Sequence, residues 1–221
     1  MPEMKPTQVA ASDPAAVQPV EQGVSEPTPF ALALLFTGHM IDRTDRKRPR
    51  FPARAEGRAR AAILASVAGI AFARPGLTVG LAAAASGGDL LFHEVCAELG
   101  IPTRILLGLP AGEFLAASVA PAGSDWVRRF HALLAARGPQ NLRIMGTHDG
   151  LLEGETDNVW QRANLWMIEE AVSLAPERVL LALWDGASGD GPGGTEHFVQ
   201  IAPEFGVRVA PPIQMQALLQ H

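Results

Sequence analysis

Short continuous apolar runs alternate along the chain with longer segments whose apolar residues recur every three or four positions. Such runs are typical of strands covered on both faces of a parallel sheet. The strands predicted in this way are Phe30–Phe36, Leu77–Leu81, Thr103–Gly108, Asn141–Met145, Arg178–Trp184 and Val207–Val209. Because helical segments separate them, the pattern predicts one three-layer α/β domain with a mainly parallel sheet and right-handed crossovers.

The helical segments carry apolar stripes at the spacing of an α-helix, which indicates one face packed on a sheet. The predicted helices are residues 53–73, a helix that begins near Asp89, a helix from Ser124 or Asp125 to before Gly138, Asp157–Ala175 and Glu196–Ala202. We interpret the segment around Glu113 and Phe114 as a loop.

The two ends of the chain differ from this pattern. Residues 1–29 are rich in Pro, Ala, Glu, Ser and Gln and poor in large apolar residues, which predicts a disordered leader. The domain is expected to span residues 30–210, and residues 211–221 to form a short tail with one amphipathic turn.

Composition narrows the classes of function. The 221 residues carry a formal net charge of −5, which argues against a nonspecific nucleic-acid binder. One cysteine excludes a disulfide framework, and neither a membrane-spanning run nor a signal peptide pattern is present, so we expect a cytoplasmic protein. The basic run Arg43–Arg60 is either a solvated face or a source of phosphate ligands.

A first glycine turn links the second strand to the following helix. Ser86 is small, Gly87 and Gly88 permit a tight turn, and Asp89 stands where the helix begins. Free N–H groups at such a helix start suit an anion, typically a phosphate. The alternative is a tight connection without a ligand, and this motif alone leaves both open.

The first strand ends in Gly38, His39 and, slightly later, Asp42. Ligands bind at the carboxyl edge of open α/β sheets, which makes these residues candidates. A loop histidine and a capping aspartate are the alternative. Asp185, at the end of the fifth strand, belongs to the same predicted edge.

A second glycine-rich turn, residues 186–197, again lies between a strand and a helix. Thr195 is suited to cap that helix and to reach a phosphate with its hydroxyl. Glycines this dense cost folding entropy, which favours a ligand-cradling loop over a plain turn.

Several common motifs are absent from the sequence. It has no GxGxxG, no Walker lysine, no HExxH and no GxSxG. The carboxylates of residues 146–157 lack a ligand spacing, so we expect neither a metal nor a cofactor.

Four segments together resemble a known superfamily: TGHMID, AAAASGGDLLFHE, WQRANLWMIEEA and DGASGDGPGGTEHF. They are similar to the SLOG superfamily of Rossmann-like domains, which includes the Smf DNA-processing proteins, the Lonely Guy phosphoribohydrolases and bacterial nucleotide-sensing modules. The likeness covers about Phe30 to Val209, and bacterial modules found beside TPR or cyclase domains look most similar.

The resemblance implies a nucleotide-derived ligand at the carboxyl edge. Gly193, Gly194 and Thr195 would contact phosphate, Gly87, Gly88 and Asp89 would line the opposite wall, and Arg162 would be the charge partner. Gly38 and His39 would close the first loop. The Lonely Guy enzymes carry a PGGxGTxxE pattern with a catalytic Glu, whereas here Glu196 follows Thr195 directly.

Three hypotheses about function follow. The first is a nucleotide-binding sensor that catalyses no reaction. The second is a hydrolase that cleaves the N-glycosidic bond of a nucleoside monophosphate, with Glu196 or Asp89 as acid/base and Arg162 on the phosphate. The third is a self-associating scaffold without a ligand, and we leave a homo-oligomer open in every case.

Overall fold

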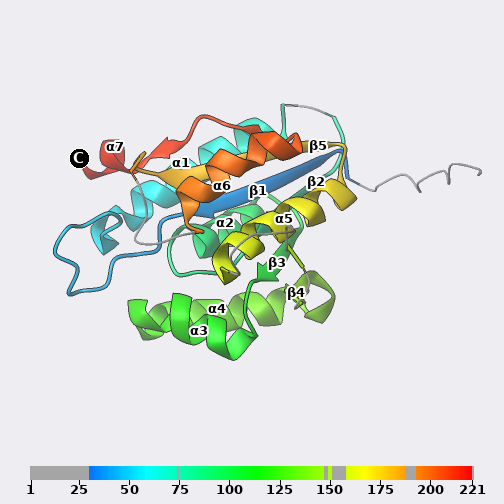
Figure 1. The fold of residues 1–221 in the computed structure, drawn as a ribbon. Coiled ribbons are helices and arrows are strands. Elements are labelled where there is room, and N and C mark those ends of the chain that lie inside the picture. Colours follow the sequence, from blue (N-terminus) through cyan, green and yellow to red (C-terminus); the bar gives the residue numbers. More distant parts are fainter. Residues whose placement is uncertain (1–29, 74, 147–148, 151–157, 188–192, 221) are drawn as a thin grey trace, which may run out of the picture.

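The computed structural model describes residues 30–73, 75–146, 149–150, 158–187 and 193–220. In these residues a seven-stranded sheet lies between two layers of helices (Figure 1). All strand pairings are parallel, which confirms the predicted α/β class. The predicted leader, residues 1–29, lies outside the described residues.

The strands are β1 (Leu32–Gly38), β2 (Thr78–Ala82), β3 (Thr103–Leu107), β4 (Leu142–Ile144), β5 (Glu177–Trp184), β6 (Arg208–Val209) and β7 (Ile213–Gln214). The α-helices are α1 (Glu56–Ala71), α2 (Gly88–Glu98), α3 (Ala111–Ser118), α4 (Ser124–Arg137), α5 (Val159–Leu174), α6 (Thr195–Ile201) and α7 (Met215–Leu219). Four 3₁₀ segments join them at Ala53–Ala55, Ala120–Ala122, Pro139–Asn141 and Ala202–Phe205.

The sheet order is β4-β3-β2-β1-β5-β6. Strand β7 pairs with the same edge of β5 as β6 does, but nearer the carboxyl end of β5. Strand β1 is central, and its residue Leu35 pairs with Leu81 on one side and Leu180 on the other. The chain proceeds from β1 toward β4 and then returns to β5, so the order reverses between β1 and β5. Such a switch point leaves a crevice outside the carboxyl ends of the two strands.

Alternating side chains of the strands build two cores. On one face, α1, α2 and α4 pack Ile63, Phe92 and Phe130 against the sheet. On the other face, α5 and α6 contribute Trp166 and Phe198. Both faces of β1 are therefore covered, which explains its continuous apolar run.

The structure differs from the predicted elements in two places. Helix α3 occupies a segment that we expected to be a loop, and its Phe114 is buried. Strand β7 follows Pro211 and Pro212, which have no N–H to donate and interrupt the edge between β6 and β7. The predicted tail thus packs on the sheet, with Met215 fully buried.

Candidate functional site

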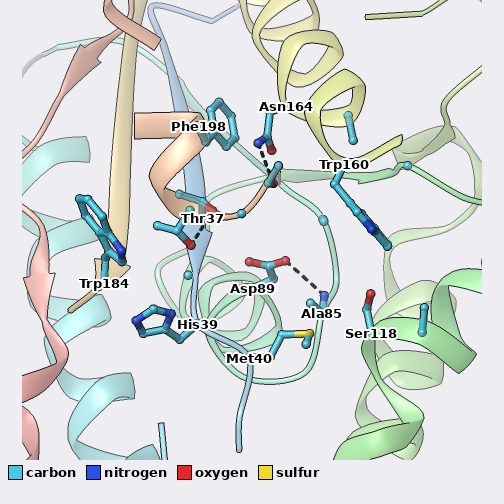
Figure 2. Close-up of a pocket in the computed structure, with 18 of the residues that line it drawn as sticks. Thr37, His39, Met40, Ala85, Asp89, Ser118, Trp160, Asn164, Trp184 and Phe198 are labelled. Atoms are coloured by element: carbon cyan, nitrogen blue, oxygen red, sulfur yellow. Dashed lines mark hydrogen bonds between the residues drawn. The ribbon is translucent and has the colours of Figure 1, made fainter. Parts of the chain in front are cut away.

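A cavity of about 690 Å³ opens at the carboxyl edge of the sheet (Figure 2). Its walls come from the loops after β1, β2 and β5 and from α3, α5 and α6. This volume lies within the range typical of small-molecule sites. The predicted site residues that line it are Gly38, His39, Asp42, Asp89, Gly193, Gly194, Thr195 and Glu196. Those that do not line it are Ser86, Gly87, Gly88, Arg162 and Asp185.

The first glycine turn contacts the protein's own backbone. Gly87 has φ of 101° and pairs with Met40, and a Cβ on it would lie 2.5 Å from the Ile41 nitrogen. The N–H of Gly88 donates to the His39 carbonyl at 3.1 Å. These glycines permit the loop after β1 to cross the turn closely, so the predicted anion cradle of bare amides is absent at Gly88.

Ser86 joins two neighbouring segments through its backbone. Its N–H donates to the Ser118 carbonyl at 2.9 Å, and its carbonyl accepts the N–H of Ile41 at 3.0 Å. The residue is buried and thereby links α3 to the loop after β1. Ser86 therefore has a structural role and does not line the cavity, where we predicted it.

Asp89 lies in the first turn of α2, which begins at Gly88, one residue before the predicted start. Its Oδ2 accepts the N–H of Ala85 at 3.2 Å, and the side chain is 8% exposed. Burial raises the pKa of this carboxyl to about 7, against the smaller opposing effect of the Ala85 hydrogen bond. A carboxyl that is half protonated near neutrality thus faces the cavity.

His39, Arg50 and Asp185 form a connected group at the β1–β5 switch point. Arg50 donates from Nε and Nη2 to the two Asp185 oxygens, each at 3.1 Å. Burial alone would raise the pKa of Asp185, but these hydrogen bonds outweigh burial and hold it at about 2. Arg50 therefore belongs to the site rather than to a solvated basic face.

The imidazole of His39 contacts Asp185 through Nε2. Its Nε2 accepts the backbone N–H of Asp185 at 3.2 Å and also lies 3.1 Å from Asp185 Oδ1. The short second distance would suit an ion pair, but an accepting Nε2 cannot carry a proton. Burial and the charge of Arg50 lower the pKa of His39, against the smaller opposing effects of Asp185 and Asp42.

Asp42 closes the loop that follows β1. Its Oδ2 accepts the N–H groups of Arg50 and Phe51, both at 2.9 Å. The carboxylate lies at the cavity wall, but two of its hydrogen bonds fix the local backbone. These contacts are those of a capping aspartate, which was the alternative to a ligand-binding role for Asp42.

The second glycine turn packs on the start of α5. Gly193 has φ of 82°, and a Cβ on it would lie 2.4 Å from the Cβ of Trp160. Asn164 Nδ2 donates to the Gly193 carbonyl at 2.9 Å and fixes the turn. Residues 188–192, which include the start of the DGPGGT motif, lie outside the described residues.

Thr195 begins α6 but does not cap it. The N-cap is Gly194, without a side-chain cap, and Thr195 Oγ1 instead lies 3.3 Å from Thr37 Oγ1 (Figure 2). Because α6 has only seven residues, its dipole is a weak source of anion affinity. The neighbouring Glu196 lines the cavity, and its Oε1 accepts from Gln200 at 3.4 Å.

The guanidinium of Arg162 binds backbone carbonyls. Its Nε donates to the Asp149 carbonyl at 3.2 Å and its Nη2 to the Gly146 carbonyl at 3.0 Å. These contacts hold the segment before α5, and the residue is not part of the cavity wall. Arg162 therefore does not lie where we predicted a contact with the ligand's phosphate.

Sequence reasoning missed the aromatic wall of the cavity. Trp160, Phe114 and Ser118 line it from α5 and α3, and Trp184 lines it from the end of β5. The rings of Phe114 and Trp160 meet edge to face at 6.3 Å. Trp160 lies three and seven residues before Ala163 and Met167, at the spacing of the apolar stripe, so the sequence pattern does not distinguish it from a core residue.

The cavity wall has two chemically different sides. Its described charged residues lie on the loop after β1 and at the starts of α2 and α6: His39 when protonated, Asp42, Arg43, Asp45, Arg46, Arg50, Asp89 and Glu196. The described lining residues of α3, β3 and α5 carry no charge. One side thus suits a charged group and the other a flat uncharged one.

The described residues contain neither a membrane-spanning helix nor a metal-binding cluster. No helix among them is long and apolar enough to cross a membrane. Nor do three or more His, Cys, Asp or Glu side chains of this part of the chain gather in a way that could hold a metal ion.

Comparison with known proteins gave one solved structure to report. No family model and no curated protein matches the chain. The X-ray structure of DNA processing protein A (DprA) from Streptococcus pneumoniae is similar, with a TM-score of 0.37 and 10% identity, over 86% of this chain. The match covers 62% of the DprA chain, and likeness at this level supports no inference about ligand or reaction.

Proposed function

We propose that the protein binds a nucleotide or a nucleotide-derived small molecule in the carboxyl-edge cavity. The two-sided wall carries this proposal, because a nucleotide has a flat uncharged base at one end and an anionic phosphate at the other. Arg43, Arg46 and Arg50 lie on the charged side, and Phe114 and Trp160 on the other.

The position and size of the cavity also support the proposal. It lies at the switch point between β1 and β5, where α/β sheets bind ligands. Its volume of about 690 Å³ accommodates a mononucleotide. The resemblance of the sequence to SLOG motifs points to the same ligand class, as part of a nucleotide-sensing module.

The proposal is tested by thermal shift with AMP, GMP, CMP, UMP, IMP, cyclic AMP and ADP-ribose. A ligand at a hundredfold excess over its dissociation constant stabilises the folded state by about 2.7 kcal/mol. We expect at least one probe to raise the melting temperature with a saturable dose dependence.

A matched pair of variants places the binding. Ala117 is an exposed residue of α3 that lines the cavity, so Ala117→Trp narrows it without disturbing the core. Ala116, its exposed neighbour, does not line the cavity and provides the control Ala116→Trp. Loss of the shift in the first variant alone supports the proposal, and equal shifts in both contradict it.

A second candidate function is hydrolysis of the N-glycosidic bond of a nucleoside monophosphate. The specific observation is Asp89, whose raised pKa of about 7 keeps an acid available near neutrality. Water would add to C1′ as the bond to the base breaks. Asp89 would give its proton to the departing base, and the Glu196 carboxylate would take a proton from the water.

Release of free base measures this reaction. The full chain is incubated with AMP, and adenine and ribose 5-phosphate are quantified by chromatography. Hydrolysis that Asp89→Asn abolishes supports an enzyme. Binding of AMP without any release supports the sensor.

A further inference from the structure

Asp89 lines the cavity with a carboxyl group that makes only one hydrogen bond to the described residues. Oδ2 accepts the Ala85 N–H, and no hydrogen bond or ion pair from a described residue reaches Oδ1. Figure 2 shows the carboxyl in the middle of the cavity, between Thr37 and Ser118 in this view. A side chain that is 8% exposed thus presents a free acceptor to whatever fills the space.

The surroundings of Asp89 make a ligand donor valuable at this point. Most of the lining residues that the loop after β2, β3, α3 and α5 contribute to this cavity are apolar: Ala83, Ala85, Leu106, Phe114, Ala117, Trp160, Ala163 and Met167. A largely buried carboxylate costs free energy while one of its oxygens accepts no hydrogen bond from the protein. A ligand that brings an N–H group removes this cost, whereas a ligand that brings a carbonyl oxygen increases it.

From this arrangement, and resting on the proposed nucleotide ligand, we infer that Asp89 Oδ1 accepts a hydrogen bond from the exocyclic amino group of the nucleobase. The cavity then selects amino bases over their oxo counterparts. The base is the part of a nucleotide that fits beside Phe114 and Trp160, and its amino group is a donor on the ring's edge. The phosphate extends toward Arg43, Arg46 and Arg50.

The charge of Asp89 decides the selectivity, so the solution pH is part of the design. An ionised carboxylate only accepts hydrogen bonds, whereas a protonated carboxyl also donates and tolerates a carbonyl. At pH 8.5 the carboxyl, with its pKa of about 7, is ionised in the free protein. The other titratable or charged lining residues are His39, Asp42, Arg43, Asp45, Arg46, Arg50 and Glu196; α3, β3 and α5 add none among the described residues.

The test is isothermal titration of the full chain at pH 8.5 with probe pairs that differ by one amino group. In AMP and IMP, and in CMP and UMP, a carbonyl oxygen replaces the amino group and the adjacent ring nitrogen gains a proton. In GMP and IMP, a hydrogen atom replaces the amino group, so this pair tests the amino group without a change in the ring nitrogens. We expect about tenfold or greater preference for the amino base in at least one pair, the size of one charge-assisted hydrogen bond. Equal affinity within every pair, or tighter binding of the oxo bases, overturns the inference.

Asp89→Asn separates Asp89 from the rest of the site. Its amide oxygen still accepts the Ala85 N–H, and its NH₂ group donates to a carbonyl. We expect the preference to shrink to about threefold or less, or to reverse. Glu113→Gln removes one carboxylate from the exposed surface of α3 and should retain the preference.

Failure of this inference and failure of the proposed function give different results. If nucleotides bind, and Ala117→Trp prevents it, but Asp89→Asn leaves every preference unchanged, the function stands and the role of Asp89 is wrong. If no nucleotide binds the wild-type chain at all, the proposed function fails and the inference with it.

Discussion

Replacing Asp89 by asparagine should stabilise the protein in a strongly pH-dependent manner. The pKa of this carboxyl is 3.8 in an ordinary setting and about 7 in the fold. The folded state therefore binds more protons than the unfolded state between these values. Stability of the wild type falls as the pH rises through this window, and it stays low above pH 7.

The magnitude follows from the two pKa values. Each pH unit between 3.8 and about 7 costs about 1.4 kcal/mol, so the ionised form is destabilised by about 4 kcal/mol at pH 8. At pH 5 the cost is about 1.6 kcal/mol, because only the unfolded state is then ionised. Asp89→Asn abolishes this dependence, and its advantage over the wild type grows by about 2.5 kcal/mol from pH 5 to pH 8.

Urea unfolding of wild type and Asp89→Asn at pH 5, 6, 7 and 8 measures the difference. All other ionisable groups are the same in both proteins, so their contribution cancels in the comparison. Glu113→Gln, which removes an exposed carboxylate, should follow the wild-type curve. If the wild type and Asp89→Asn have parallel stability curves, Asp89 has an ordinary pKa and the reasoning is refuted.

Three further changes test other contacts. Arg50→Gln removes the donors that keep the pKa of Asp185 at about 2. The stability that Asp185 contributes in the wild type is present above pH 3.8 and is lost toward pH 2. Unfolding followed by circular dichroism should therefore show that the variant is about 1–3 kcal/mol less stable at pH 7 and that its free energy of unfolding falls less between pH 3.8 and pH 2. Gly193→Val forces a Cβ to 2.4 Å from Trp160 and should lower the melting temperature by several degrees in a thermal scan; an unchanged value would contradict the described turn. Arg129→Met loses three ion pairs, to Glu56, Glu94 and Asp125, and a contact 3.9 Å above Trp126, and should cost about 1–2 kcal/mol in urea unfolding without changing nucleotide affinity; a changed affinity would contradict the remoteness of this residue from the cavity.

The location of the cavity could be predicted from the sequence because parallel strands end at one edge. Gly38 and His39 stand at the end of β1, Asp89 follows β2 and Gly194 follows β5, yet all four line one cavity. Their convergence depends only on strand direction and on the alternation of strands and helices. Both properties are visible as apolar runs and stripes.

The roles of the glycines could not be predicted in the same way. Gly87 and Gly88 resemble an anion cradle, but their spacing reflects the loop after β1, which crosses them at Ile41. That crossing is set by the path of a segment more than forty residues earlier in the chain. A local motif carries no information about such a neighbour.

The uncharged wall was missed for a different reason. Helix α3 is short, and Phe114 forms no repeating stripe from which a helix could be predicted. Its contact with Trp160 brings together α3, which lies between β3 and β4, and α5, which lies between β4 and β5. Only the packed structure shows that these rings, which belong to one of the two cores, also line a cavity.

The four tryptophans allow the most direct test of nucleotide binding in the carboxyl-edge cavity. Trp160 and Trp184 line the cavity, whereas Trp126 and Trp166 do not. Nuclear magnetic resonance of the indole N–H groups, with AMP or the best nucleotide probe added stepwise, should show saturable shifts at Trp160 and Trp184 only. Shifts confined to Trp126 and Trp166, or no shift with any of the probes, would contradict the account.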